Sequence, residues 1–509
     1  MSRSKPLIIR LNPKDNVVVA LVDLEPGKAI TEEGIVCLDM IPGGHKVATE
    51  TIPRGAYICK YGQTIGISSK EIRPGAHVHT HNVEMSDFGR EYAIGSEITQ
   101  TQYMRENDCA CFDGIVRPNG RVGSRNYIGI LATVSCSASI ARYIADAFRE
   151  NALAPFPNVD GVVALSHFTG CGIPAEGEDI GRLQRCLAGF ARHPNFGGVI
   201  IVGLGCEVNQ IDLLIENMGL ETGPLLSTMI IQAEGGTEKC VQRGMSLIRD
   251  MLPEVNEIER RSMPISNLIV GLECGGSDAY SGITANPALG AAVDLLVRSG
   301  GTAVLSETTE IYGAEHLLTR RAVSNEVGEK LAGLIRWWED YTTKHGTTLD
   351  NNPTPGNKAG GITTILEKSL GAASKGGTTN LVDVYAYAEP VVSKGLVFMD
   401  TPGYDPASVT GMVAGGANIV CFTTGRGTVY GCKPTPVIKL ASNTAMYNKL
   451  RDDMDMDCGD IIDGNVSVQE SGERIFRFIL ETASGRKTKS ELHGIGDCEF
   501  LPWQTGPVL

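Results

Sequence analysis

The sequence predicts a multidomain protein in which an N-terminal all-β module precedes two α/β domains with largely parallel sheets. At 509 residues the chain is too long for one ordinary hydrophobic core, so roughly two to four domains are expected. Short apolar runs separated by Pro and Gly fill the N-terminal part. After Gly114, longer apolar runs alternate with segments of helical period. This change of pattern divides the chain into an all-β part and an α/β part.

Residues 1–85 form the predicted all-β module. Runs such as NVVVALVDL, GIVCLDM and AYICKYG are separated by recurring I-P-x-G turns, in which Pro fixes φ and Gly accepts a positive φ. No apolar period of helical length occurs in this part of the sequence. Residues 86–113 are polar and have no period, and they are predicted to be a linker or an arm that lies over another domain.

The α/β part is predicted to form two domains, residues 114–255 and residues 260–509. Buried strands of the first are indicated by NYIGILATVSC, VDGVVALSHFTGC and GGVIIVGLGCE. Strands of the second are indicated by NLIVGLECGG, GTAVLSETTE, TNLVDVYAYAE, GLVFMDTPG and NIVCFTTGRGT, and one long helix is expected over residues 314–342. Continuous apolar strands that alternate with helices are typical of parallel sheets covered on both faces.

Composition excludes several classes of partner. The formal charge is -14 and no run of Lys or Arg occurs, so nucleic acid is not expected as a partner. The N-terminal MSRSKPLIIRLNPKDN has neither a secretory signal nor a membrane span, so we expect a cytoplasmic protein with no membrane partner. The 14 cysteines include no CxxC pair, which favours reduced thiols. A homodimer is expected only because closed symmetric assemblies are common.

Three cysteines close the predicted strands of the first α/β domain. Cys136, Cys171 and Cys206 follow one another at equal intervals, so successive βα units would bring them along one edge of one sheet. Three thiolates suit iron, or an iron–sulfur cluster with one iron open to substrate. The alternative is that they are small residues without a ligand, since Cys is common in protein interiors.

Polar side chains at the ends of the predicted strands are the candidate substrate-binding groups. They are His167, Glu207, Asn209, Ser277, Asp278, Asn357, Lys358 and Arg426, and the same edges carry Glu273, Cys274, Glu307 and Glu310. Hydroxyl, amide and charged groups with few aromatics suit a polyhydroxylated carboxylate, for which Arg426 or Lys358 would provide the cation. Taken singly, each residue is equally well explained as a helix cap or a surface charge. There is no P-loop and no strand–GxGxxG–helix pattern, which disfavours nucleotide chemistry.

The segment HVHTHN holds three of the nine histidines of the chain. In a strand, His77, His79 and His81 would lie on one face, about 7 Å apart, and would suit a metal ion or a proton relay. His45 and Lys46, in GHKVA of the same module, add a base and a cation. The alternative is a solvent-facing strand whose histidines have no function.

Several motifs together resemble the altronate/galactarate dehydratase family over essentially the whole chain. They are GHKVA, HVHTHN, GRVGSRN, GLGCE, ECGGSDAYSGITANP, PGNKAGGITT and FTTGRGT. The resemblance implies an N-terminal SAF-type β-clip domain, two family-specific α/β domains, and dehydration of a sugar acid with Fe²⁺ or a similar divalent metal such as Mn²⁺. HVHTHN and YGAEHLL are similar to the altronate branch, which implies conversion of D-altronate to 2-dehydro-3-deoxy-D-gluconate.

The resemblance also implies a mechanism and its residues. The proton α to the carboxylate is abstracted, the β-hydroxyl departs, and the enol tautomerises to a 2-keto-3-deoxy acid. His45, His77, His79 and His81 become acid/base or metal-ligand candidates, and Lys46 would stabilise the enolate. Galactarate dehydration, sulfite elimination from sulfolactate, and non-catalytic sensing of a sugar acid remain alternatives. The metal site stays open between these histidines and Cys136, Cys171 and Cys206.

Overall fold

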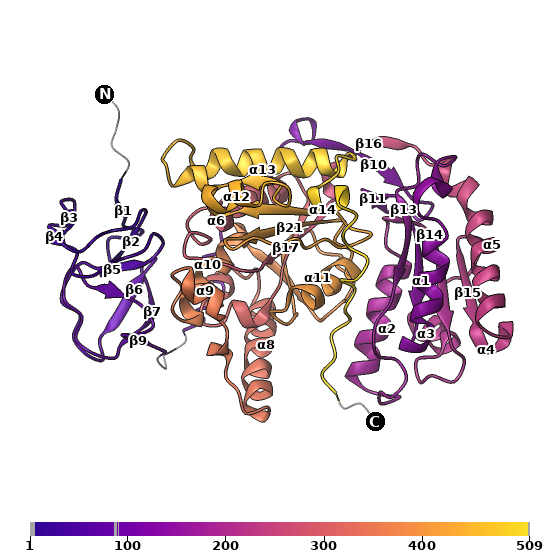
Figure 1. Cartoon of the computed structure of the whole chain (residues 1–509), viewed down its shortest axis with the longest axis horizontal. Helices are drawn as coiled ribbons and strands as arrows, with labels where there is room; N and C mark the ends of the chain where they lie inside the picture. The colour runs from indigo at the N-terminus through magenta and orange to yellow at the C-terminus, as the bar shows by residue number, and fades with distance from the viewer. Residues whose placement is uncertain (1–5, 86–88, 90, 507–509) are drawn as a thin grey trace.

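The computed structural model describes residues 6–85, 89 and 91–506 and shows three bodies in a row (Figure 1). The all-β module lies at one end, the C-terminal α/β domain in the middle, and the other α/β domain at the far end. This arrangement confirms the predicted fold class. The first five residues of the predicted module, and residues 86–88 and 90 of the predicted linker, lie outside the described residues. Within the described ranges, no helix has the length and apolarity needed to cross a membrane.

The N-terminal module consists of short antiparallel strands. Its sheets have the orders β1-β2-β5-β8, β6-β7-β9 and β3-β4. One of its two apolar cores, around Ile58 and Ile65, continues into the C-terminal domain through Leu370 and Ala373. The strands are β1 (Ile8–Ile9), β2 (Val17–Ala20), β3 (Ala29–Ile30), β4 (Ile35–Val36), β5 (Lys46–Ala48), β6 (Tyr57–Lys60), β7 (Gln63–Ser68), β8 (His77–Val78) and β9 (Val83–Glu84).

The second domain is a parallel sheet of order β13-β12-β14-β15. Apolar residues of α1 and α5 pack on one face of the sheet, and those of α2 and α3 pack on the other. The elements are β12 (Tyr127–Ala132), α1 (Ala138–Asp146), β13 (Gly161–Leu165), α2 (Glu178–Ala191), β14 (Phe196–Gly203), α3 (Ile211–Met218), β15 (Leu226–Ile230), α4 (Ile231–Glu234) and α5 (Thr237–Asn256).

The C-terminal domain is a parallel sheet of order β19-β20-β18-β17-β21-β22-β23. Helices α6, α8 and α13 cover one face, while α11 packs on the other, where it meets α2 of the second domain. The elements are β17 (Ile269–Cys274), α6 (Ala285–Arg298), β18 (Thr302–Leu305), α7 (His316–Thr319), α8 (Asn325–Lys344), α9 (Pro355–Ala359), α10 (Ile365–Ala373), β19 (Leu381–Tyr385), β20 (Gly395–Met399), α11 (Asp405–Ala414), β21 (Ile419–Thr424), β22 (Val437–Ala441), α12 (Thr444–Lys449), β23 (Met456–Asp457), α13 (Val468–Ala483) and α14 (Lys489–Leu492). Because the chain adds strands first on one side of β17 and then on the other, the loops after β17 and β21 diverge and leave room for a ligand.

Two local features differ from the sequence-based expectation. A small antiparallel sheet of order β11-β10-β16 joins the two α/β domains, and β10 (Cys111–Val116) begins inside the predicted linker; its partners are β11 (Val122–Gly123) and β16 (Arg260–Pro264). The single helix expected over residues 314–342 is wrong, because the chain forms α7 and α8 instead. The two helices are separate because Ser324 caps the start of α8, where its side chain accepts a hydrogen bond from Val327 N (3.3 Å).

A buried ionic cluster attaches the N-terminal module to α10. Lys46 Nζ lies 2.8 Å from Glu367 Oε2, Lys60 Nζ lies 2.8 Å from Glu367 Oε1, and all three side chains are at most 1% exposed. Burial alone would raise the pKa of Glu367, but the two ammonium groups outweigh it and hold the pKa well below its usual range. The carboxylate therefore keeps its charge and its stabilising effect at neutral pH, and loses them only as the pH falls towards the depressed pKa.

We expect Glu367→Ala to lower the free energy of unfolding by about 3–5 kcal/mol, because it leaves two buried ammonium groups without a counter-ion. Urea unfolding at pH 7 measures this effect. The control is Glu481→Gln, which breaks the ion pair with Arg486, where both side chains are about half exposed; that change should stay below about 1 kcal/mol. Equal effects of the two substitutions would contradict the role given to Glu367.

Candidate functional site

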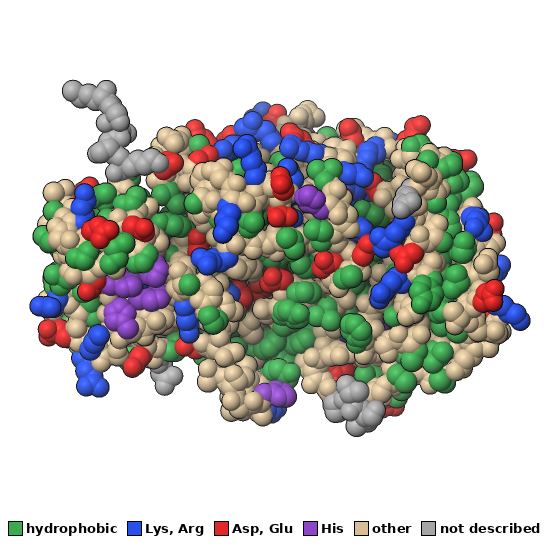
Figure 2. Space-filling view, in the orientation of Figure 1, with side chains coloured by type: hydrophobic (Ala, Val, Ile, Leu, Met, Phe, Trp, Pro, Cys, Tyr) green, Lys and Arg blue, Asp and Glu red, His purple; other side chains and the backbone are tan. Residues whose placement is uncertain are grey.

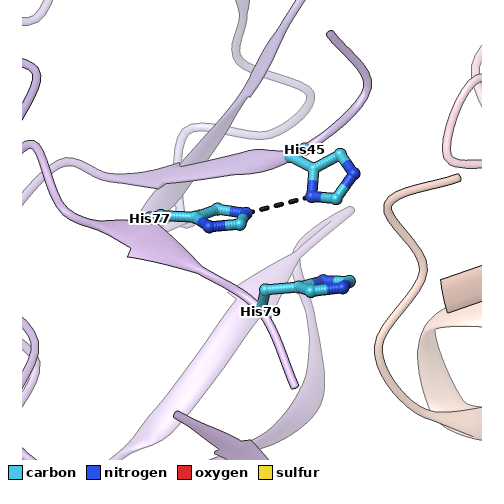
Figure 3. Close-up of side chains that lie close together, drawn as sticks. All are labelled: His45, His77 and His79. Atoms are coloured by element: carbon cyan, nitrogen blue, oxygen red, sulfur yellow. Dashed lines mark hydrogen bonds between the residues drawn. The ribbon is translucent and has the colours of Figure 1, made fainter. Parts of the chain in front are cut away.

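Three histidines of the N-terminal module converge on one point (Figure 3). Strand β5 pairs with β8 so that Val47 lies opposite His77, which brings His45 beside that ring. The expectation that His77, His79 and His81 alternate along one strand is wrong, because β8 ends at Val78. The chain then turns, since His79 N donates to Asn82 Oδ1 (2.8 Å) and Asn82 N donates to His79 O (2.9 Å). The turn stacks the ring of His79 on that of His77, with centroids 5.4 Å apart.

One ring nitrogen from each of His45, His77 and His79 lies within 4.8 Å of the others. His45 Nδ1 and His77 Nε2 share a hydrogen bond of 3.0 Å, drawn in Figure 3. The exposed His81 stands outside this set, with its ring centroid 5.4 Å from that of His77. Figure 2 shows histidine side chains gathered on the part of the module nearest the central domain. We call His45, His77 and His79 the histidine group.

The histidine group is held in the neutral form that binds metals. Burial, followed by the charges of His45, His81 and Lys46, lowers the pKa of His77 to about 4. Burial and the charges of Lys46, His45 and His77 lower the pKa of His79 to about 3. His79 Nδ1 is buried without a hydrogen-bond partner among the described residues. Neutral imidazoles with converging nitrogens suit Fe²⁺, Mn²⁺ or Zn²⁺, so the residues present fit a divalent metal.

A cavity of about 460 Å³ is lined by residues of the C-terminal domain and, from the N-terminal module, by Gly43. His45 Nε2 lies 3.4 Å from Ala359 O, and Ala359 lines the cavity. The two bodies approach closely there because Gly361 has no side chain: a Cβ would lie 2.6 Å from Gly44 O. The polar part of the lining consists of Asp278, Tyr280, Arg426, Asn443 and Lys449.

The polar residues that line this cavity are of two kinds. Some form hydrogen bonds that hold the loops in place, and others form no ion pair with a described residue. Asp278 accepts hydrogen bonds from Ser281, from Ser442 Oγ (2.7 Å) and from Asn443 Nδ2 (3.0 Å), so it ties the loops after β17 and β22 together. Arg426 and Lys449 are exposed, and neither forms an ion pair with another described residue. The two cations are therefore available to an anionic ligand.

Four further predicted residues belong to the structural framework around the cavity or lie next to it. They are Ser277, Asn357 and Lys358 of the C-terminal domain, and Lys46 of the module. Asn357 Nδ2 donates to Ser277 O (2.8 Å), and both residues are buried. Lys358 lies half-buried on the same short helix, α9. Lys46 uses its three N–H groups on Gly361 O and both oxygens of Glu367, so it is already saturated with acceptors and influences a ligand only through its charge.

The predicted residues of the second domain are not brought to the histidine group within one chain. The two bodies lie at opposite ends of the molecule (Figure 1). His167 Nε2 donates to Ala132 O (2.9 Å) and its Nδ1 accepts from Thr169 N (3.2 Å), so both ring nitrogens are occupied. Glu207 accepts from Thr133 Oγ1 (2.8 Å), and Asn209 Nδ2 donates to Thr133 O (3.1 Å). These three side chains hold the strand-end loops in place.

Cys136, Cys171 and Cys206 are exposed near the ends of three adjacent strands, β12, β13 and β14. Their loops are joined by hydrogen bonds from Ser135 N to Thr169 O (3.1 Å) and from Asn209 N to Gly170 O (3.0 Å). Ligands of a single tetrahedral metal lie about 3.8 Å apart for metal–sulfur bonds of about 2.3 Å. Among the described residues, the three sulfurs do not form a group within 4.8 Å. The geometry therefore disfavours a mononuclear thiolate site, and ligation by these cysteines stays a prediction.

Sequence reasoning missed Lys60, Glu367, Tyr280, Asn443 and Lys449. Two of them carried a signal, because a charged residue within an apolar segment requires a partner when the segment is buried. Lys60 stands in AYICKYG and Glu367 in ITTILEKSLG. The other three are ordinary polar residues that only the fold places at the cavity.

Comparison with known proteins gives three family matches in the order of the three bodies. Residues 6–86 match the altronate/galactarate dehydratase SAF domain, residues 114–256 the second domain of D-galactarate dehydratase/altronate hydrolase, and residues 265–508 the C-terminal domain of D-galactarate/altronate dehydratase. The chain is 37% identical to the altronate dehydratase of Bacillus subtilis (strain 168), over 95% of this chain and 96% of that protein. It is 36% identical to the galactarate dehydratase (L-threo-forming) of Escherichia coli (strain K12), over 94% of this chain and 93% of that protein. It is 32% identical to the (2R)-sulfolactate sulfo-lyase subunit beta of Chromohalobacter salexigens, over 77% of this chain and 96% of that protein.

In metal-free protein, we expect the imidazole NMR signals of His77 and His79 not to titrate between about pH 5 and pH 8, because their pKa values are about 4 and 3. Assignment uses the variants His77→Gln and His79→Gln. Free imidazoles titrate near pH 6.5, so the unfolded chain takes up protons first, and the histidine group should reduce stability as the pH falls below about 6.5. A midpoint near 6.5 for either residue would show that the rings are not buried as described.

Proposed function

This chain belongs to the altronate/galactarate dehydratase family, and we propose that it is a cytoplasmic, metal-dependent hydro-lyase that converts D-altronate to 2-dehydro-3-deoxy-D-gluconate. The observation that carries the proposal is the histidine group, which stands beside a cavity of about 460 Å³ with two free cations, Arg426 and Lys449. Such a cavity matches a small polyhydroxylated carboxylate in size and polarity.

The cofactor we propose is Fe²⁺, or Mn²⁺ in its place, held by His45, His77 and His79. When bound there, the ion supplies Lewis acidity towards an oxygen of the substrate. Three protein ligands leave coordination positions open, as in other catalytic metal sites. The buried Lys46 and Glu367 behind the group keep β5, and with it the position of His45, fixed against the C-terminal domain.

The residues of the chain divide the remaining tasks. Arg426, with its planar fork of N–H groups, holds the substrate carboxylate, and Lys449 adds a second cation. The hydroxyl of Tyr280 donates to Ala20 O (3.3 Å) and can still accept a hydrogen bond from a substrate hydroxyl. His81 lies next to the histidine group but is not one of its proposed ligands. Its ring is exposed and can exchange protons with solvent, so we assign to it the transfer of the α-proton of the substrate.

The choice of altronate rests on the histidine segment. HVHTHN is similar to the altronate branch, and two of its three histidines belong to the histidine group. Galactarate dehydration is the first alternative, because the identities to an altronate dehydratase (37%) and to a galactarate dehydratase (36%) are nearly equal. Sulfite elimination from sulfolactate and binding of a sugar acid without turnover are the further alternatives.

We expect the anaerobically purified protein to form a 2-keto-3-deoxy acid from D-altronate when Fe²⁺ is present, and to lose this activity with a chelator. The assay compares D-altronate, galactarate and 3-sulfolactate under the same conditions.

His79→Ala removes a proposed metal ligand and should therefore reduce kcat/KM strongly. Loss of a residue that only hydrogen-bonds to a metal ligand costs roughly 10–100-fold, and the effect of His79→Ala should be larger than that. The control is His167→Gln, which lies in the second domain and should leave the rate within about a factor of ten. Full activity after chelation would contradict the metal, binding without product would favour a sensor, and a preference for another substrate would replace altronate.

A second candidate cofactor is an iron–sulfur cluster on Cys136, Cys171 and Cys206. The observation in its favour is that three exposed thiols stand on three hydrogen-bonded loops at adjacent strand ends. A cluster spans a wider set of sulfurs than a single ion does, and three cysteines leave one iron open. If this cofactor is present, protein purified without oxygen has broad visible absorbance that Cys171→Ser removes and Cys498→Ser retains, since Cys498 is equally exposed but is not one of the three proposed ligands. A colourless protein without acid-labile sulfide would rule out the cluster.

Light scattering of the same preparation tests the predicted homodimer.

A further inference from the structure

A tight turn of the N-terminal module brings one side chain against the C-terminal domain. The turn consists of Tyr61 and Gly62, between β6 and β7. Asp15 holds it, since its carboxylate accepts hydrogen bonds from Tyr61 N (3.2 Å) and Gly62 N (2.7 Å). Tyr61 has φ of 60°, a left-handed conformation that is rare for a residue with a Cβ and persists where the surroundings enforce it.

The ring of Tyr61 meets the C-terminal domain at two glycines. They are Gly282, in the loop between β17 and α6, and Gly371 of α10. A Cβ at Gly282 would overlap the hydroxyl oxygen of Tyr61 and would lie 3.0 Å from Gly371 Cα. The ring also packs on the apolar core that the two bodies share. Because only glycine permits so close an approach, the loop after β17 lies directly against Tyr61.

The loop after β17, residues 275–284, also forms part of the wall of the cavity of about 460 Å³, through Asp278 and Tyr280. Hydrogen bonds within the loop make it rigid, because Asp278 Oδ1 accepts from Ser281 N (2.8 Å) and from Ser281 Oγ (2.9 Å). Ser281 is the neighbour of Gly282 in the chain. A shift of Gly282 would therefore move the cavity wall as well.

The module contacts this loop on two sides. A second cavity, of about 10 Å³, is lined by both Tyr61 and Asp278. Since Asp278 also lines the larger cavity, this residue faces the ring of Tyr61 on one side and the proposed substrate space on the other. Further along the loop, the hydroxyl of Tyr280 donates to Ala20 O of the module (3.3 Å). The position of the loop thus depends on the module.

We propose that Tyr61 is a positioning residue for the substrate: by supporting Gly282 it fixes Asp278 and Tyr280 in the wall of the cavity. This inference rests on the proposed function and deepens it, because substrate affinity then depends on a residue that does not line the cavity. Tyr61 belongs to the β6–β7 turn, whereas β5, β8 and the turn after β8 hold the histidine group. Loss of its ring should therefore affect substrate binding and leave metal binding unchanged.

Steady-state kinetics of the full-length protein with Fe²⁺ test this role. Tyr61→Ala should raise KM for D-altronate about tenfold, as expected for one misaligned hydrogen bond, and leave kcat within about a factor of three. A contact that only stabilised the fold would lower the folded fraction, and with it the apparent kcat, without changing KM. The amount of Mn²⁺ bound in equilibrium dialysis should stay the same. The control is Tyr57→Ala, also on the module, which should leave KM unchanged because Tyr57 is 55% exposed.

A second measurement tests the contact itself. Gly282→Ala should raise KM, because the added Cβ overlaps the hydroxyl of Tyr61 and displaces the loop. Tyr61→Phe removes that oxygen and keeps the ring, so alone it should leave KM close to that of wild type. The double variant Gly282→Ala/Tyr61→Phe should have a KM closer to that of wild type than Gly282→Ala has, a non-additive effect that only residues in contact produce.

The outcomes separate this inference from the proposed function. An unchanged KM in Tyr61→Ala, or additive effects at positions 61 and 282, would overturn the role of Tyr61. If circular dichroism shows that one of the variants does not fold, the other measurement decides. If wild type does not convert D-altronate, the proposed function fails, and the same kinetics with galactarate or 3-sulfolactate, whichever is converted, decide on Tyr61. Conversion of none of the three would overturn both.

Discussion

The carboxylate of Glu367, held between the ammonium groups of Lys46 and Lys60, is the interaction on which the rest of the site depends. It joins a small β-module to a large α/β domain in a place from which water is excluded. Buried ion pairs seldom contribute much net stability, but an incorrectly docked module would leave these charges unpaired, so the cluster selects one orientation. That orientation places Gly44 against Gly361 and His45 next to Ala359, and it brings Gly43 to the edge of the cavity in the C-terminal domain.

Burial is the main cause of the neutral state of the histidine group. It lowers the pKa of both His77 and His79, and the neighbouring histidines and the charge of Lys46 lower these pKa values further, so the ring nitrogens are available as ligands. In the cavity nearby, Arg426 and Lys449 supply positive charge that no described carboxylate neutralises. The histidine group touches the lining of this cavity through His45 Nε2, which lies 3.4 Å from Ala359 O. We therefore propose that the neutral donors of the module and the cations of the C-terminal domain serve one anionic ligand.

The sequence predicted the elements with strong local signals and failed where long-range contacts decide. The strands β12, β14, β17 and β21 were predictable, because a buried parallel strand is a continuous apolar run. The turn after β8 was not, since it depends on Asn82 folding back onto His79. Lys46 was recognised as a candidate, but its saturation by Glu367, 321 residues away, required the fold. For the same reason His167 and Glu207 resembled ligand-binding groups while the structure uses them to hold loops.

We propose that the histidine group of the β-module binds a metal ion where the module meets the C-terminal domain, and anomalous diffraction is the sharpest test. Crystals of the full-length protein grown with Mn²⁺ and D-altronate would be measured on both sides of the manganese absorption edge. We expect an anomalous peak bounded by His45, His77 and His79, with the sugar acid in the adjoining cavity and its carboxylate towards Arg426. Ordered imidazoles without a peak, or a substrate bound away from that cavity, would contradict it.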